Sequence, residues 1–290
     1  MTQIRLWRRW WHAAERAVTT GRWPARLATE LGASTAVAVE RHSIELDQPL
    51  GSGNQLSIAF ASDFHAGPNT PEGLLDASVR KLESLSADLL LLGGDFVSVR
   101  PEYMGDLARR LAAIPAPLGR YAVLGNHDHW TDGPAVGRML TDAGIHMLTN
   151  RHVGLPAPFE HVSLCGLDDH TTGEPDAAAA FAGARPVRIV LMHAPSSLLD
   201  IGDRPFTVAL CGHTHGGQIA LPNGRPLKVA HGPLSRQYNA GRFELGDGRV
   251  LIVSRGIGCS TLPLRVNAPP AVLACTVTGR NAVRPGPGEA

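Results

Sequence analysis

The amino-acid sequence predicts an α/β fold whose sheets are largely buried. The first observation is a series of five short apolar runs, each of four to seven residues and each ending at glycine or a polar residue. Runs of this length are typical of strands that are covered on both faces. The second observation is that helical patterns separate the first four runs, and such alternation indicates an α/β architecture.

The five apolar runs all stop at side chains that can bind metals. The runs cover residues 56–62, 89–92, 121–124, 187–192 and 206–211. In α/β sheets, ligands bind beyond the carboxyl ends of the strands. The polar residues that follow the runs are therefore expected to meet at one place: Asp63 and His65, Asp95, Asn126 to Asp128, His193, and His213 and His215.

Three helices are expected between these strands. The first has Thr70 as its cap and Pro71 in its first position, a place where proline is favoured. The second begins near Pro101. The third begins near Pro134 and ends at Gly144, because glycine commonly follows the last turn of a helix.

The last part of the chain is richer in strands and turns. Within residues 219–277, the runs 249–254 and 271–277 are strand-like, and we expect them to complete a second sheet. Residues 51–280 are therefore interpreted as one domain, followed by a flexible tail at 281–290.

The overall composition is that of a globular protein. Of the 290 residues, 43% are hydrophobic and 18% are charged, with a formal net charge of +1. The lack of a basic excess argues against a nucleic-acid partner. No apolar run reaches the ~18 residues of a transmembrane helix. The four cysteines are widely spaced, mostly in apolar runs, and are interpreted as buried thiols: Cys165, Cys211, Cys259 and Cys275.

The N-terminal segment, residues 1–50, has a different character. Residues 1–26 contain six arginines against the single acid Glu15, and four of the five tryptophans of the chain. Their spacing predicts an amphipathic helix with a tryptophan-rich face. Such a helix suits the plane of a membrane interface, and packing on the protein itself or on a second subunit is an equal alternative.

The polar residues at the strand ends form a metal-binding set without any thiolate. They offer seven oxygen or nitrogen ligands: Asp63, His65, Asp95, Asn126, His193, His213 and His215. Seven ligands are too many for one catalytic ion with an open position, but they suit two ions bridged by one carboxylate. Mixed imidazole and carboxylate ligands favour manganese, iron or zinc over calcium or magnesium.

These motifs, in this order, resemble those of the calcineurin-like metallophosphoesterases. The resemblance implies a four-layer αββα sandwich of two mixed sheets. Position by position, it implies that Asp63, His65 and His215 hold one ion, that Asn126, His193 and His213 hold the other, and that Asp95 bridges them. The stretch GHTHGGQ at 212–218 resembles a bacterial branch that is often membrane-associated. Some relatives of that branch hydrolyse UDP-2,3-diacylglucosamine.

The resemblance also implies a mechanism. A hydroxide bridging the two ions would attack the phosphorus of a phosphodiester or pyrophosphate, and His127 would protonate the leaving oxygen as general acid. Ser98 stands where serine/threonine protein phosphatases carry an aspartate, which argues against that subclass. Asp128 is then a candidate for orienting His127. The implied location is cytoplasmic, on the inner face of the membrane.

Several alternatives stay open. The chain could be a non-catalytic scaffold of the same fold, or a nucleotide phosphodiesterase without a lipid substrate, and nothing specifies its oligomeric state. Residues 168–170 either line the pocket or form a capped turn. Arg255 and Arg265 either clamp a phosphate or form ordinary ion pairs. The remaining histidines are expected on the surface or in loops: His12, His42, His129, His146, His152, His161, His170 and His231.

Overall fold

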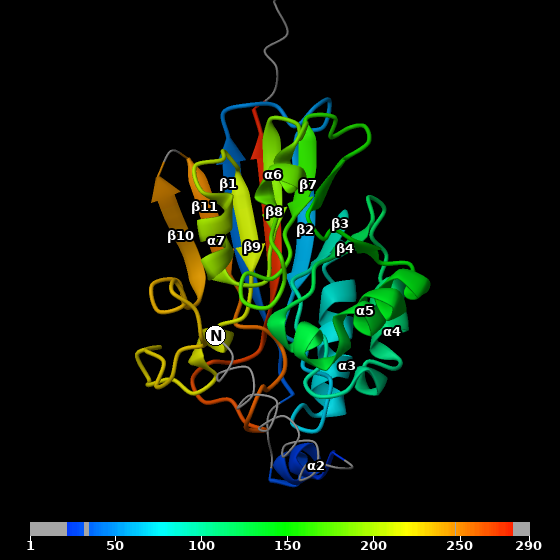
Figure 1. Ribbon diagram of the computed structural model, residues 1–290, viewed down its shortest axis with the longest axis vertical. Helices are drawn as coiled ribbons and strands as arrows, with labels where there is room; N and C mark the ends of the chain where they lie inside the picture. Colours follow the sequence, from blue (N-terminus) through cyan, green and yellow to red (C-terminus); the bar gives the residue numbers. More distant parts are fainter. Residues whose placement is uncertain (1–21, 32–34, 247, 281–290) are drawn as a thin grey trace, which may run out of the picture.

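Two six-stranded sheets form the centre of the computed structural model, which describes residues 22–31, 35–246 and 248–280 (Figure 1). The first sheet has, in spatial order, β1 (Ala38–Leu46), β12 (Ala271–Gly279), β2 (Gln55–Ala61), β3 (Leu89–Leu92), β4 (Arg120–Ala122) and β5 (His146–Met147). The second sheet has β10 (Gly241–Gly246), β11 (Arg249–Val253), β9 (Val208–Cys211), β8 (Val187–Leu191), β7 (Val162–Gly166) and β6 (Arg151–Gly154). Both sheets contain parallel and antiparallel pairs, so the prediction of two mixed sheets is confirmed.

Helices cover the outer face of each sheet. The first sheet is covered by α3 (Glu72–Glu83), α4 (Leu107–Ala113) and α5 (Asn126–Ala143), and the second by α6 (Ala177–Phe181) and α7 (Leu198–Ile201). Short 3-10 turns lie at Pro101–Tyr103, Pro195–Ser197 and His215–Gly217, and α2 (Trp23–Glu30) lies at one end of the molecule (Figure 1).

Three apolar cores hold these layers together, because side chains alternate across each strand. On β2, Ile58 and Phe60 point between the sheets, whereas Ala59 and Ala61 point toward the helices. The outer core of the second sheet includes Cys211. All four cysteines are buried free thiols, as their apolar surroundings predict.

The helices of the first sheet differ in their first residues from the prediction. Thr70 does not cap α3, because its hydroxyl accepts the Cys259 amide at 3.0 Å. Helix α5 begins at Asn126, eight residues before Pro134, and bends at Asp132, whose carboxylate caps the amide of Ala135 at 3.0 Å. The proline signal therefore marks the second half of a bent helix, and the half that carries His127 has no such signal.

The assignment of residues 219–277 to the second sheet is half wrong. The hairpin of β10 and β11 does join the second sheet, but β12 lies in the first sheet between β1 and β2. The reason is that β12 pairs along its full length with β1 and along six residues with β2. The first sheet thus begins at Ala38, within the segment 1–50 that the sequence analysis treats separately.

Most of the predicted N-terminal amphipathic helix and the tail at 281–290 lie outside the described residues. In the part of the chain that the structure describes, no helix is both long enough and apolar enough to cross a membrane.

Candidate metal centre

The seven predicted ligands come together at one edge of the two sheets. Four follow strands of the first sheet and three follow strands of the second: Asp63 and His65 after β2, Asp95 after β3, Asn126 after β4, His193 after β8, and His213 and His215 after β9. All seven side chains are buried. The sequence prediction that the strand ends converge is therefore confirmed by the geometry.

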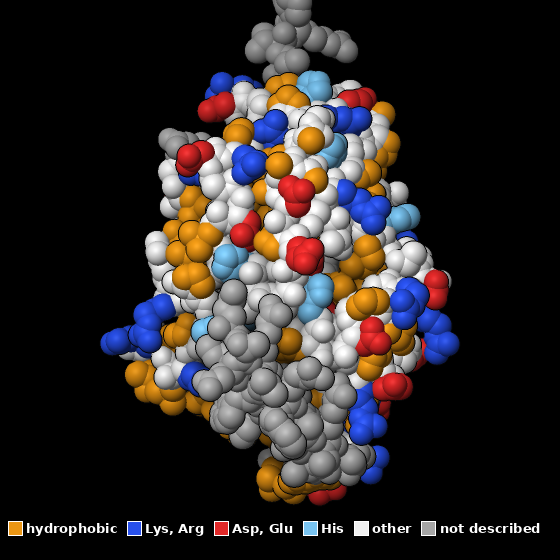
Figure 2. Space-filling view, in the orientation of Figure 1, with side chains coloured by type: hydrophobic (Ala, Val, Ile, Leu, Met, Phe, Trp, Pro, Cys, Tyr) orange, Lys and Arg blue, Asp and Glu red, His pale blue; other side chains and the backbone are white. Residues whose placement is uncertain are grey.

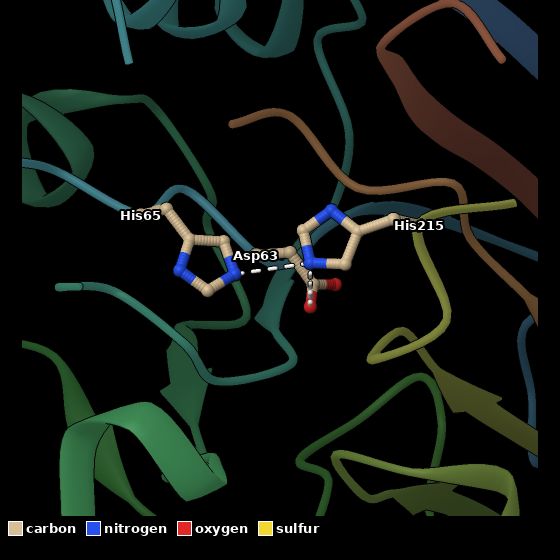
Figure 3. A group of neighbouring side chains, drawn as sticks. All are labelled: Asp63, His65 and His215. Carbon is tan, nitrogen blue, oxygen red and sulfur yellow. Dashed lines mark hydrogen bonds and ion pairs between the residues drawn. The ribbon is translucent and has the colours of Figure 1, made fainter. Parts of the chain in front are cut away.

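The first group of ligand atoms comprises Asp63, His65 and His215 (Figure 3). Nε2 of His65 lies 3.0 Å from Nε2 of His215, which in turn lies 3.4 Å from Oδ1 of Asp63. Backbone and hydroxyl donors hold the aspartate in place: the His213 amide lies 3.0 Å from Oδ2, and the Ser62 hydroxyl donates to the same oxygen at 2.6 Å.

The second group comprises Asn126, His193 and His213, with Asp95 beside them. Nε2 of His193 lies 3.1 Å from Oδ1 of Asn126, 3.2 Å from Nδ1 of His213 and 3.3 Å from Oδ2 of Asp95. One nitrogen of His193 thus faces an amide oxygen, an imidazole and a carboxylate at once, which is the arrangement expected around a cation.

Asp95 connects the two groups. Its Oδ2 lies 3.3 Å from His193 in the second group and 3.5 Å from His65 in the first. Its other oxygen accepts the backbone amide of His127 at 2.8 Å. This hydrogen bond orients the carboxylate so that a single oxygen faces both groups.

The polar surroundings of the histidines select which nitrogen faces the centre. Nδ1 of His193 lies 2.8 Å from the carbonyl of Gly93, so this N–H donates outward and Nε2 points inward. Nε2 of His213 lies 2.7 Å from the carbonyl of His231, so in this residue Nδ1 points inward. Because buried carboxylates need a balancing charge and the facing atoms are nitrogen and oxygen, the residues fit divalent manganese, iron or zinc.

The electrostatics of the first group agree with this fit. Burial lowers the pKa of His65 and of His215 well below 6.5, which keeps both imidazoles neutral and able to bind a metal. Burial also raises the pKa of Asp63, to about 6. A nearby cation would reverse that last shift, because it favours the charged carboxylate.

The electrostatics of the second group have another origin. Burial alone would raise the pKa of Asp95, but the charges of His193 and His127 outweigh it and hold that pKa well below 3.8. Against the effect of burial, Asp95 in turn raises the pKa of His193 well above 6.5. Both shifts have one main cause, the mutual attraction between the Asp95 carboxylate and the His193 imidazole in its charged form.

Backbone strain is concentrated at the same residues. The φ angles are positive at five of the seven ligands: 54° at Asp63, 44° at His65, 54° at Asp95, 70° at His213 and 55° at His215. This region costs residues other than glycine about 1–3 kcal/mol each, and such strain collects at functional sites. The strained backbone at the strand ends therefore fixes the positions of these five side chains.

The profile of the family described as calcineurin-like phosphoesterase matches residues 56–217, a range that contains all seven ligands and His127. The chain belongs to the calcineurin-like phosphoesterase family. The resemblance that the motifs indicate is thereby confirmed.

Relatives of this phosphoesterase carry related names. The uncharacterized metallophosphoesterase YkuE of Bacillus subtilis (strain 168) is 32% identical over 78% of this chain and 79% of its own. Phosphodiesterase YaeI of Escherichia coli (strain K12) is 33% identical over 74% and 79%, respectively. UDP-2,3-diacylglucosamine pyrophosphatase LpxG of Chlamydia muridarum (strain MoPn / Nigg) is 29% identical over 70% and 78%. The chain is thus an enzyme of the metallophosphoesterase class.

His127 of this phosphoesterase lies beside the first group of ligands. Its half-buried ring meets the ring of His65 edge-on at 4.6 Å and the ring of Trp130 at 4.8 Å. Its Nδ1 lies 3.5 Å from the carbonyl of Ser98. A ring nitrogen of His127 also lies within 4.8 Å of ligand atoms of His65 and Asp95, close enough to serve either as an acid or as a further ligand.

Asp128 does not have the role expected of it as the partner of His127. Its Oδ1 accepts the amides of Phe96 at 2.8 Å and of Val97 at 3.2 Å, and its Oδ2 accepts the amide of Gly125 at 3.0 Å. Both oxygens thus bind the backbone of the strand-end loops. The His127 ring instead lies near the carbonyl of Ser98, the residue that stands where the protein phosphatases carry an aspartate.

A cleft of about 580 Å³ opens onto the metal centre. Its lining includes Asp95, Asn126, His127, His213 and His215. It also includes Trp130 and the loop residues 227–231 and 260–262. Substrate bound here would contact both the candidate metal ligands with His127 and apolar loop residues.

Neither arginine that we considered for phosphate binding lines this cleft. Arg255 pairs with Glu40 at 2.6 Å, as in an ordinary ion pair. Arg265 donates to the carbonyls of Arg255, Gly258 and Ala268, and its Nη2 lies 2.9 Å from Nδ1 of His215. Arg265 therefore supports the loop behind His215, a candidate metal ligand.

Residues 168–170 form a capped turn, with Asp169 accepting the amides of Thr171 and Thr172. His129, which was expected on the surface or in a loop, is partly exposed on α5, with Nε2 2.9 Å from Oδ1 of Asp168. The assignment of His231 to a loop is right, but sequence alone did not show that its carbonyl orients His213. The only available sign for His129 was its place in the run Asn126-His-Asp-His-Trp130, and a backbone carbonyl such as that of His231 has no sequence signature.

Proposed function

We propose that this protein is a dinuclear metal-dependent phosphoesterase that cleaves a phosphodiester or pyrophosphate bond. The observation that carries this proposal is the position of Asp95 Oδ2, 3.5 Å from His65 and 3.3 Å from His193. A single carboxylate oxygen between two separate ligand groups is what a pair of bridged ions requires.

Each ligand group would hold one ion. Asp63, His65 and His215 would bind the first, Asn126, His193 and His213 the second, and Asp95 both. When bound, the two ions supply Lewis acidity that activates water and offsets charge on the phosphoryl oxygens.

The remaining chemistry falls to His127. Its ring lies at the cleft beside His65, where the leaving oxygen of a bound ester would lie within reach. As a general acid, it would transfer a ring proton to that oxygen as the P–O bond breaks, which typically contributes about 10²–10⁴-fold to the rate. The Ser98 carbonyl near Nδ1 supports the ring in this orientation.

The substrate class follows from the apolar part of the cleft lining. Leu227 and Leu262 line the cleft and are also partly exposed to solvent. Apolar side chains next to a phosphate-cleaving centre favour a lipid-linked phosphoester such as UDP-2,3-diacylglucosamine, the substrate in the name of the LpxG relative. A protein acting on such a substrate would work at the inner face of the membrane.

Two variants test the roles of Asp95 and His127. Asp95→Asn should lower the content of both ions, because the bridging carboxylate is lost, and should reduce kcat/KM for bis(p-nitrophenyl) phosphate by at least about 10²-fold. His127→Ala should keep near wild-type metal content and lower kcat by about 10²–10⁴-fold. Metal analysis by mass spectrometry and steady-state kinetics measure both quantities.

The control is His146→Ala, which removes an exposed histidine outside the cleft and should change neither quantity. Full activity of a protein stripped of metal would contradict the proposal. If His127→Ala emptied a metal site, His127 would be a ligand instead of the acid. Turnover of nucleotide diesters with no turnover of UDP-2,3-diacylglucosamine would refute the lipid-linked substrate.

A further inference from the structure

An apolar surface adjoins the cleft, whose lining includes two of its residues, Leu227 and Leu262. Five large apolar side chains on loops 219–227 and 260–267 are between 41% and 64% exposed: Leu221, Leu227, Leu262, Leu264 and Val266. We call these five residues the rim. Single exposed leucines are common on protein surfaces, whereas a group of them next to a cleft marks an interaction site.

The rim is held in place by hydrogen bonds between its two loops. The Ala220 amide donates to the Val266 carbonyl at 2.9 Å, and the Val266 amide donates to the Gln218 carbonyl at 3.0 Å. The buried side-chain amide of Gln218 donates to the carbonyls of Leu262 and Leu264 at 2.9 and 3.2 Å. The loops therefore form one supported unit, and the exposure of the rim is built into the fold.

Exposed basic residues lie on the first rim loop and in the segment that follows it, and the two rim loops contain no acidic residue. Residues 204–243 and 248–280 contain no aspartate or glutamate. Arg225, Lys228 and Arg236 are exposed on the first of these stretches. Figure 2 shows basic and apolar side chains next to each other at the lower left of the molecule.

Other exposed apolar residues lie at the same end of the molecule. Helix α2 and the rim loops are both below the sheets in Figure 1. On and next to that helix, Trp23, Leu27 and Leu31 are between 45% and 78% exposed. In the described part of the chain, this end thus combines exposed apolar side chains, basic residues and the mouth of the cleft.

We propose that the rim is a docking surface for an anionic phospholipid membrane. The apolar side chains would enter the headgroup region, and Arg225, Lys228 and Arg236 would contact lipid phosphates, each worth about 1 kcal/mol near an anionic surface. If the proposed phosphoesterase function also holds, the cleft would open directly onto the bilayer, and a lipid-linked substrate would reach the metal centre without leaving the membrane.

Charge selects the membrane over the other possible occupants. A second copy of this chain on a two-fold axis would place the same basic residues against each other. The N-terminal segment 1–21 carries four arginines and one glutamate, so it too has the same sign of charge as the rim. An anionic membrane offers an apolar interior for the exposed apolar side chains of the rim and negative phosphates for its basic neighbours.

Co-sedimentation of the full chain with vesicles tests this proposal. Wild type should bind vesicles of phosphatidylcholine and phosphatidylglycerol, and binding should weaken as salt rises. Leu221→Ser with Leu264→Ser should weaken the association about tenfold or more, since both apolar contacts are lost. Arg225→Glu should weaken it about fivefold or more, because attraction becomes repulsion.

Matched controls lie elsewhere on the surface. Leu199→Ser on α7 removes a leucine that is 56% exposed, and Arg138→Glu on α5 reverses another exposed charge. Both should bind vesicles like wild type. Circular dichroism and the thermal midpoint of each variant report whether it is folded.

Unchanged vesicle binding by the folded rim variants would overturn the proposal. If deletion of residues 1–21 alone abolished binding, the membrane contact would belong to that segment. If the rim variants changed only the oligomeric state, the rim would be a protein interface. Hydrolysis of soluble bis(p-nitrophenyl) phosphate by the same preparations tests the proposed function separately, so an inactive protein that binds vesicles would refute the function and keep the docking surface.

Discussion

Two histidines of one motif are supported in different ways at the centre. His213 turns Nδ1 inward because its Nε2 donates to the His231 carbonyl, whereas Nε2 of His215 faces Asp63 and His65. This difference assigns the two imidazoles to separate ligand groups although only Thr214 lies between them. At this scale, the hydrogen bond on the far side of each ring decides the chemistry.

His129 and Asp168 form a pair next to the centre whose behaviour with pH can be predicted. Burial by itself would lower the pKa of His129, but the hydrogen bond to Asp168 and the charge of Asp168 raise this pKa above 6.5. Burial by itself would raise the pKa of Asp168. The hydrogen bonds from His129 and from the Glu174 amide outweigh burial and hold that pKa below 3.8. The side chains are 22% and 12% exposed, so solvent screens the pair only in part.

We therefore expect Asp168→Asn to lower the pKa of His129, measured by NMR titration of its imidazole. Because the folded-state pKa of His129 is raised, its contribution to stability is fully present below about pH 6.5 and is lost as the pH rises through the folded-state pKa. Because the folded-state pKa of Asp168 is lowered, its contribution to stability is present above about pH 3.9 and is lost as the pH falls through the folded-state pKa. The loss of unfolding free energy in Asp168→Asn should thus be largest between about pH 4 and 6.5. Asp200→Asn, which changes the partner of His170, is the control, and an unchanged His129 titration in Asp168→Asn would contradict the pairing.

The candidate ligands are positioned by the way the strands end, and Gly212 is the clearest case. Gly212 follows β9 immediately, and a Cβ at this position would lie 2.1 Å from Oδ2 of Asp63 and 2.1 Å from Oγ of Ser62. The ends of β2 and β9 can approach each other only because this side chain is absent. The close approach of the two sheets at the candidate metal centre thus depends on the absence of a side chain at Gly212.

Gly212→Ala should therefore lower both metal content and the free energy of unfolding, the latter by about 1–3 kcal/mol, since the added methyl overlaps Asp63. Gly137→Ala is the matched control, because a Cβ on that helical residue meets nothing within 4 Å. It should raise stability by up to about 1 kcal/mol, as alanine favours a helix. Urea denaturation and metal analysis measure both effects, and equal stability of the two variants would refute the close approach.

At the scale of the whole molecule, each proposed ion would be held by residues from both sheets. The first group combines two residues after β2 with one after β9, and the second combines one residue of α5 with two that follow β8 and β9. The apolar core between the sheets brings their edges together, and metal binding would join those edges further. Metal affinity and global stability should therefore be linked.

Manganese or zinc added to metal-free protein should raise the thermal midpoint. A concentration of 100 times Kd corresponds to about 2.7 kcal/mol of stabilisation. Chelation should reverse the increase, and Asp95→Asn should show little of it. Differential scanning calorimetry with and without the metal measures the shift, and His146→Ala serves as the control with a wild-type response. A midpoint that is independent of metal would contradict ligation from both sheets.

Sequence alone predicted the five strands that lead into the candidate site, β2, β3, β4, β8 and β9, and the seven candidate ligands that follow them, because these properties are local. An apolar run with a glycine stop specifies a buried strand and its end, and parallel strands must then present their carboxyl ends at one edge. Only the tertiary structure decided that β12 joins the first sheet, that Asp128 binds backbone amides, and that His231 orients His213. These outcomes depend on partners distant in sequence and often on backbone atoms, which every residue carries alike and which no sequence pattern can therefore mark.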